Sequence, residues 1–165
     1  MKTLLILRHA KSSWKEARLG DHGRPLNERG KRDAPRIGVL LRKEDLVPGM
    51  ILSSTAKRAQ QTAEAVVEES GYPGEIQLSR ELYAAGPEAY LEAIQSLAGE
   101  PDSVLVVGHN PGLEELVEIL TGETVRLPTA ALAQVALSIE RWQELSEEVR
   151  GELVNLWVPR ELDGY

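Results

Sequence analysis

Short apolar runs alternate along this chain with stretches in which apolar residues recur every three or four positions. Six of the short runs predict β-strands, because their length and bounding polar or turn-forming residues suit buried strands. They cover residues 3–7, 50–53, 75–78, 103–107, 133–138 and 153–158. The pattern continues to the end of the chain with no internal repeat and no linker, which predicts one domain over residues 1–165.

Four helices are predicted between the strands from apolar positions at helical spacing. These positions are Ala34, Ile37, Gly38 and Leu41; Ala59, Thr62, Ala63, Val66 and Val67; Tyr90, Leu91, Ile94, Leu97 and Ala98; and Leu113, Leu116, Val117 and Leu120. Asn27 and Thr55 suit the caps of the first two helices, and Pro87 and Pro111 suit the first turns of the others. The alternation predicts an α/β fold, a three-layer sandwich with a mostly parallel sheet of about six strands and helices on both faces.

Composition narrows the class of protein. A hydrophobic content of 42% and a charged content of 27% are typical of a soluble globular domain. The apolar start is too short for a signal peptide, so we expect a cytoplasmic protein with no membrane partner. The chain has no cysteine, which excludes disulfides and thiol catalysis. Its three histidines form no clustered ligand motif, so we expect no metal and no other cofactor.

Charge is unevenly distributed. A net charge of −7 argues against a nucleic-acid partner, since such proteins need a basic face. Basic residues nevertheless crowd the first fifth of the chain, at Arg8, Lys11, Lys15, Arg18, Arg24, Arg29, Lys31 and Arg32. A cationic pocket on an acidic body suits a small anionic group better than a polyanion.

Candidate reactive residues follow the predicted strands. They are His9 after the first strand, Ser53, Ser54 and Arg58 after the second, Glu81 after the third and His109 after the fourth. Ligands of open parallel sheets bind beyond the carboxyl ends of the strands. We therefore expect these side chains to project from one edge of the sheet.

The residue types predict phosphoryl chemistry. A neutral imidazole such as His9 can attack phosphorus if its other nitrogen is held protonated by an acceptor. The neighbouring Arg8 can anchor the phosphate. Arg58 lies in the first turn of a predicted helix, where backbone N–H groups also favour an anion. His109, at a glycine-containing junction between strand and helix, can stabilise the charge that develops during transfer.

The general acid is left open between two carboxyl groups. Glu81, at the end of the third predicted strand, could protonate a leaving group, and so could Asp21, on a loop near His9. Either residue could instead be the salt-bridge partner of an arginine in the pocket. Arg24 could supply a third cation to the phosphate.

Together these segments resemble the histidine phosphatase superfamily, which has a phosphoglycerate mutase-like fold. The resemblance rests on Arg8-His9, on the segment 53–63 with its Arg-Ala and Gln-Thr-Ala sequences, and on Gly108-His109. It implies that His9 is phosphorylated during turnover and that Arg8, Arg58 and His109 line the phosphate pocket. Ala10 replaces the usual glycine after the Arg-His pair, which adds a methyl group and removes no functional group.

The chain is most similar to the small SixA-type phosphohistidine phosphatases, in the opening segment 8–12, the loop 21–26 and its compactness. Between Glu81 and His109 there is room for one helix and one strand, without a helical cap. The resemblance implies an open site that accepts a phosphorylated protein of the histidine-containing phosphotransfer type. Two alternatives remain: a phosphatase of small phosphorylated metabolites or nucleotides, and a non-catalytic phosphate-binding module.

Overall fold

A computed structural model of the chain describes residues 1–162 and 164–165 and contains the six predicted strands. Their observed bounds are β1 Lys2–Arg8, β2 Met50–Ser54, β3 Ile76–Ser79, β4 Ser103–Gly108, β5 Leu132–Leu137 and β6 Gly151–Trp157. The predicted spans coincide with these strands, with small shifts at the ends. The prediction succeeds because β1, β2, β4 and β5 are mostly buried and therefore have distinctly apolar sequences, whereas the edge strands β3 and β6 are half-buried or exposed.

The four predicted helices are also present. They are α1 Glu28–Lys43, α2 Lys57–Ser70, α3 Pro87–Gln95 and α4 Gly112–Thr121, with short 3₁₀ turns at η1 Ala17–Leu19, η2 Arg80–Leu82, η3 Trp142–Glu144 and η4 Pro159–Glu161. Within the part of the chain that the structure describes, no helix has the length and apolar character needed to cross a membrane.

The helix caps are predicted only in part. The side chain of Asn27 accepts a hydrogen bond from the Gly30 backbone N–H at 2.9 Å, so the predicted cap of α1 is confirmed. The predicted cap of α2 at Thr55 is wrong, because the residue that precedes this helix is Ala56. The Thr55 hydroxyl bonds instead to Nε2 of His22 at 2.9 Å.

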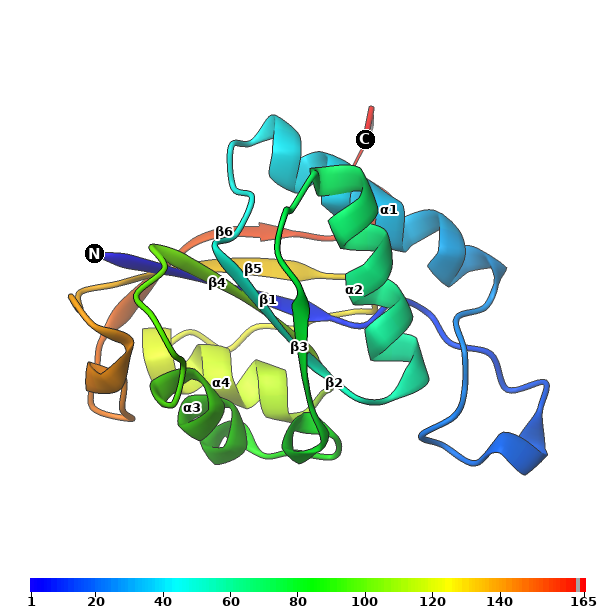
Figure 1. Cartoon of the computed structure of the whole chain (residues 1–165), viewed down its shortest axis with the longest axis horizontal. Coiled ribbons are helices and arrows are strands. Elements are labelled where there is room, and N and C mark those ends of the chain that lie inside the picture. The colour runs from blue at the N-terminus through cyan, green and yellow to red at the C-terminus, as the bar shows by residue number, and fades with distance from the viewer. Residues whose placement is uncertain (163) are drawn as a thin grey trace.

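The order of the strands brings the important chain segments together. The sheet has the order β3-β2-β4-β1-β5-β6, and only β5 runs opposite to the others (Figure 1). Arg8 pairs with Gly108 and Ser53 pairs with Val107 across the parallel ladders. The carboxyl ends of β2, β4 and β1 are therefore neighbours, and the residues that follow them emerge side by side.

Helices cover both faces of the sheet, as predicted. Helices α1 and α2 pack on one face, and α3 and α4 pack on the other (Figure 1). Side chains alternate between the two layers along β1: Leu4 and Ile6 belong to the cluster under α3 and α4, and Leu5 and Leu7 to the cluster under α1 and α2. All four leucine and isoleucine side chains are fully buried.

Gly108, the last residue of β4, allows the core to hold the backbone of His109. A Cβ atom at Gly108 would lie 2.2 Å from the hydroxyl oxygen of Tyr90. That hydroxyl accepts a hydrogen bond from the His109 N–H at 3.0 Å and donates to the Leu82 carbonyl at 3.3 Å. The backbone of His109 is therefore held in place by the buried Tyr90 hydroxyl.

We predict that Gly108→Ala lowers the free energy of unfolding by about 1–3 kcal/mol, because the new methyl group overpacks a buried site. Urea denaturation measures the change. Removal of the hydroxyl in Tyr90→Phe relieves the closest contact, so the double variant loses less than the sum of the two single losses. Wild-type stability in Gly108→Ala would contradict this packing account.

Candidate active site

The predicted edge of the sheet carries a cavity of about 210 Å³. Its lining consists of Arg8, His9, Lys11, Ser12, Trp14, Arg24, Arg58, His109, Asn110 and Thr129. Five of the candidate residues named from the sequence are in this set, and they come from four segments: the end of β1, the loop before α1, the start of α2 and the residue after β4. No carboxyl group of the described residues lines the cavity, whereas basic groups dominate it. The arrangement suits a small anion.

His9 is held in one tautomer by its two neighbours. The ring is 7% exposed, its Nδ1 lies 2.7 Å from the Ala10 carbonyl oxygen, and its Nε2 lies 3.4 Å from Nε of Arg58. A carbonyl only accepts a hydrogen bond and a guanidinium only donates, so the proton must be on Nδ1. The lone pair is then on Nε2, the atom that faces the arginine.

Burial keeps the His9 ring neutral. The pKa of His9 is lowered from 6.5 to about 3, mainly by burial and also by the neighbouring His109, Arg58 and Arg8, against the opposing effect of the Ala10 carbonyl. A neutral ring with an unprotonated Nε2 is the form that a nucleophile requires.

Arg58 is fixed at the start of α2 by the loop that contains Asp21. Its Nη1 donates to the Asp21 carbonyl at 2.7 Å, and its Nη2 donates to the Asp21 carboxylate at 3.0 Å. The side chain is 6% exposed. A buried guanidinium held on one side by these bonds presents its Nε–H to Nε2 of His9.

Thr62, one turn after Arg58 on α2, connects that helix to the His9 turn. Its hydroxyl donates to the Arg58 carbonyl at 2.7 Å and accepts from the Ala10 N–H at 3.0 Å. The sequence pattern indicates Thr62 only as a buried helix position. Its place within the Gln-Thr-Ala sequence was the signal that could have revealed its polar role.

His109 lies beside His9, with their ring centroids 5.1 Å apart. Its Nε2 is 2.8 Å from the hydroxyl oxygen of Ser54, at the end of β2. Its Nδ1 is buried and has no hydrogen-bond partner among the described residues. Burial, followed by the charge of Arg58, lowers the pKa of His109 to about 4. Parallel pairing of β1 with β4 produces this closeness, as the sequence predicted.

Arg8 and Arg24 complete the basic lining. Nη1 of Arg8 donates to the Leu127 carbonyl at 3.0 Å, while its buried Nε has no partner among the described residues. Nη1 of Arg24 donates to the Ser12 hydroxyl at 2.8 Å. The Arg24 guanidinium also stacks on the indole of Trp14, with 3.4 Å between its central carbon and the ring centroid.

Asp21 is the salt-bridge partner of both arginines beside it. Its Oδ1 accepts from Arg24 at 3.0 Å, and its Oδ2 accepts from Arg58 at 3.0 Å and from the Tyr83 hydroxyl at 2.6 Å. The Tyr83 hydrogen bond, followed by the hydrogen bonds and charge of Arg58, holds the pKa of Asp21 well below its usual range. An ionised carboxylate carries no proton to donate, so this geometry favours the salt-bridge alternative for Asp21.

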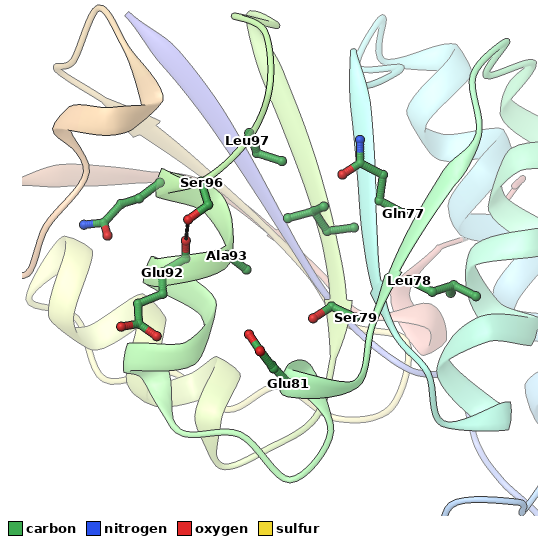
Figure 2. A pocket seen from close by; sticks show the side chains of 10 residues that line it. Gln77, Leu78, Ser79, Glu81, Glu92, Ala93, Ser96 and Leu97 are labelled. Atoms are coloured by element: carbon green, nitrogen blue, oxygen red, sulfur yellow. Dashed lines mark hydrogen bonds between the residues drawn. The ribbon is translucent and has the colours of Figure 1, made fainter.

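Glu81 lies in a different place from the other candidates. It lines a separate cavity of about 430 Å³, between β3 and α3, together with Glu92 and Ser96 (Figure 2). The 3₁₀ turn η2 follows β3 directly and buries Leu82 in the core layer of α3 and α4. Glu81 consequently stands on the α3 side, and the structure does not bring it to the His9 cavity.

Tyr83, two residues further on, takes the position that Glu81 was expected to occupy. Besides its hydrogen bond to Asp21, its ring meets His109 edge-on at 5.7 Å and His22 edge-on at 4.7 Å between centroids. The sequence held no signal for Tyr83 beyond its closeness to the end of a predicted strand. The turn that rotates the chain here is a tertiary feature.

The chain belongs to the histidine phosphatase superfamily. Residues 4–83 match the model of branch 1 of that superfamily. An uncharacterised protein of Mycobacterium leprae is 32% identical over 167 residues, covering 93% of this chain and all of the relative. The family assignment makes the protein a phosphatase.

Solved structures of the same architecture resemble it closely. A candidate phosphohistidine phosphatase SixA of Agrobacterium tumefaciens is 32% identical with a TM-score of 0.82, covering 96% of this chain and 98% of its own. The candidate SixA of Nakamurella multipartitia has a TM-score of 0.84 at 25% identity and covers 96% of each chain. A SixA protein histidine phosphatase complexed with tungstate has a TM-score of 0.79 at 25% identity and covers 96% of this chain and 97% of its own.

We predict that His9 is neutral, with its proton on Nδ1, at pH 7 and still at pH 5, because its pKa is lowered to about 3. Ring nitrogen shifts in ¹⁵N-labelled protein report the tautomer directly. The depressed pKa also implies that stability falls as pH drops below 6.5, since the unfolded chain takes up the proton first. Protonation of His9 with a midpoint near 6.5 would contradict the geometry.

Proposed function

We propose that this protein removes phosphate from a phosphorylated histidine of a partner protein, through a covalent phospho-His9 intermediate. The observation that carries the proposal is the orientation of His9: Nδ1 is held by the Ala10 carbonyl, and Nε2 faces Arg58 in the basic cavity. Only this orientation combines an unprotonated Nε2 with a cationic place for the phosphoryl oxygens.

The proposed reaction has two transfers. In the first, Nε2 of His9 bonds to phosphorus while the bond between phosphorus and the substrate imidazole breaks. The substrate ring keeps that electron pair and departs as neutral imidazole, because its other nitrogen carries a proton. In the second, water attacks phospho-His9, whose Nε2 recovers the electron pair. Both protons of the water end on the released dihydrogen phosphate.

The basic residues of the cavity and the groups that orient them have distinct places in this scheme. Arg8 and Arg58 hold phosphoryl oxygens, and Arg24 lies at the same cavity as a third cation. His109 donates a hydrogen bond to the transferring group, with its ring oriented by Ser54. Asp21 orients Arg24 and Arg58. The Ala10 carbonyl stabilises the positive ring of phospho-His9 through Nδ1.

The absence of a carboxylic acid from the described lining favours a phosphohistidine over a phosphate ester. An ester leaves as an alkoxide and needs a proton donor, whereas a protonated phosphohistidine leaves as neutral imidazole. Asp21 is ionised, and Glu81 stands in the other cavity. The proposal therefore uses no general acid from either residue.

The layers of the fold support a protein substrate. The only helix between Glu81 and His109 is α3, and it packs with α4 on one face of the sheet instead of covering the His9 cavity. Trp14, at the rim of that cavity, is 72% exposed and is available to contact a partner. The likeness to SixA phosphohistidine phosphatases is consistent with such a substrate.

We predict that His9→Ala abolishes turnover and the phosphoenzyme, while inorganic phosphate still binds to the cavity. Rapid quenching with a ³²P-labelled phosphohistidine substrate should trap an acid-labile label on the wild type. His22→Ala is the matched control and keeps the label, since His22 does not line the cavity. Wild-type turnover in His9→Ala would exclude the covalent mechanism.

A turnover assay on different substrates tests the proposed substrate class. A panel of phosphohistidine peptides, sugar phosphates and nucleotides should give turnover with the peptides. Turnover of small phosphate esters alone would assign the protein to metabolite hydrolysis. Binding of phosphate with no turnover of any substrate would make it a binding module.

We predict that Glu81→Gln changes kcat/KM for phosphohistidine by less than about twofold, since the side chain lies outside the cavity. Ser54→Ala should lower kcat by about tenfold or more, because His109 loses the group that orients it. Steady-state kinetics on one peptide compares the two variants. A large loss in Glu81→Gln with an intact Ser54→Ala would reverse the assignment.

A further inference from the structure

A second basic cavity adjoins the first. It has a volume of about 300 Å³. Its lining consists of Arg8, Glu114, Arg126, Leu127, Pro128 and Arg160. Arg8 belongs to both cavities, so one guanidinium stands between the His9 site and this neighbour. We call the second cavity the arginine subsite.

Three distant parts of the chain supply the arginines of the subsite. Arg8 ends β1, Arg126 lies in the loop between α4 and β5, and Arg160 lies in η4 after β6. Against these three cations stands one carboxylate, Glu114, in the first turn of α4. The lining is therefore positive by two charges on a chain whose net charge is −7.

The carboxylate in the subsite is already engaged. Oε2 of Glu114 accepts a hydrogen bond from the Leu127 N–H at 2.7 Å. Among residues 1–162 and 164–165, neither Arg126 nor Arg160 makes an ion pair or side-chain hydrogen bond with another group, and both are exposed. Guanidinium groups gathered in one hollow repel each other and attract an anion.

A short segment, residues 127–129, connects the two cavities. The Leu127 carbonyl accepts from Nη1 of Arg8 at 3.0 Å and from the side-chain amide of Asn110 at 2.8 Å. Leu127 and Pro128 line the arginine subsite, and Thr129 lines the His9 cavity. A molecule whose phosphoryl group lies against His9 can therefore extend past this segment toward Arg126 and Arg160.

We propose that the arginine subsite binds a second anionic group of the substrate, a carboxylate or phosphate carried by the same molecule as the transferring phosphoryl group. This inference deepens the proposed function and rests on it. In a protein substrate the group is an acidic side chain near the phosphohistidine. In a small molecule it is a second phosphate or a carboxylate.

The test compares two phosphohistidine peptides that differ only in flanking glutamates, replaced by glutamines in the second. The wild type should prefer the acidic peptide by about tenfold in kcat/KM, the ratio that one well-formed ionic contact supplies. In the double variant Arg126→Gln with Arg160→Gln, the preference should disappear because KM for the acidic peptide rises. Turnover of the glutamine peptide should remain at the wild-type value.

Arg150→Gln is the matched control, because Arg150 is an exposed arginine that lines neither cavity. It should keep the preference for the acidic peptide, which separates the subsite from the general effect of losing positive charge. Two results would overturn the inference: a preference that survives in the double variant, or an equal loss of turnover on both peptides.

If neither peptide is hydrolysed, the proposed function is refuted. A binding experiment then still tests the arginine subsite. Alkylene bisphosphonates of increasing spacer length are compared with a monophosphonate by calorimetry. The wild type should bind the bisphosphonate of one spacer length more tightly than it binds the monophosphonate. The double variant should bind that bisphosphonate and the monophosphonate with equal affinity. An unchanged ratio in the double variant would refute the subsite itself.

Discussion

The hydrogen bond from Nδ1 of His9 to the Ala10 carbonyl is the constraint on which the site depends. It sets the tautomer, and with it the nitrogen that carries the lone pair. The carbonyl cannot drift, because the N–H of Ala10 is bound to Thr62 and its methyl group is fully buried among residues of α1 and α2. The alanine that replaces the usual glycine therefore fits the core, and no positive φ occurs at this position.

One carboxylate outside the cavity lining holds two of the cations of the site in place. Asp21 binds Arg24 and Arg58 and accepts from Tyr83, so the guanidinium groups are oriented before an anion arrives. Preorganised donors of this kind stabilise developing charge without rearrangement during the reaction. The neutral state of both histidines follows from the same burial, which disfavours further positive charge beside the arginines.

These features together restrict what the phosphatase can use as a substrate. A cavity with cations, two neutral imidazoles and no carboxyl group among its described lining residues is suited to a phosphoryl donor with a good leaving group. The arginine subsite extends the binding surface on one side of that cavity, since Arg8 lines both. Recognition of a second anion beyond Arg8 would select among donors by their neighbouring charge as well as by the phosphoryl group.

The sequence by itself determined the strands, the helices, and the nearness of His9, His109 and Arg58. Buried strands have distinct apolar sequences, and parallel strands deliver their carboxyl ends to one edge. It also identified Asp21 as a carboxylate near His9, with its role left open. Only the tertiary structure decided that Tyr83 reaches the site and Glu81 does not, because a turn after an edge strand rotates side chains in a way that periodicity does not encode. The arginine subsite is likewise tertiary, since Arg8, Arg126 and Arg160 are far apart in sequence and meet only when the sheet forms.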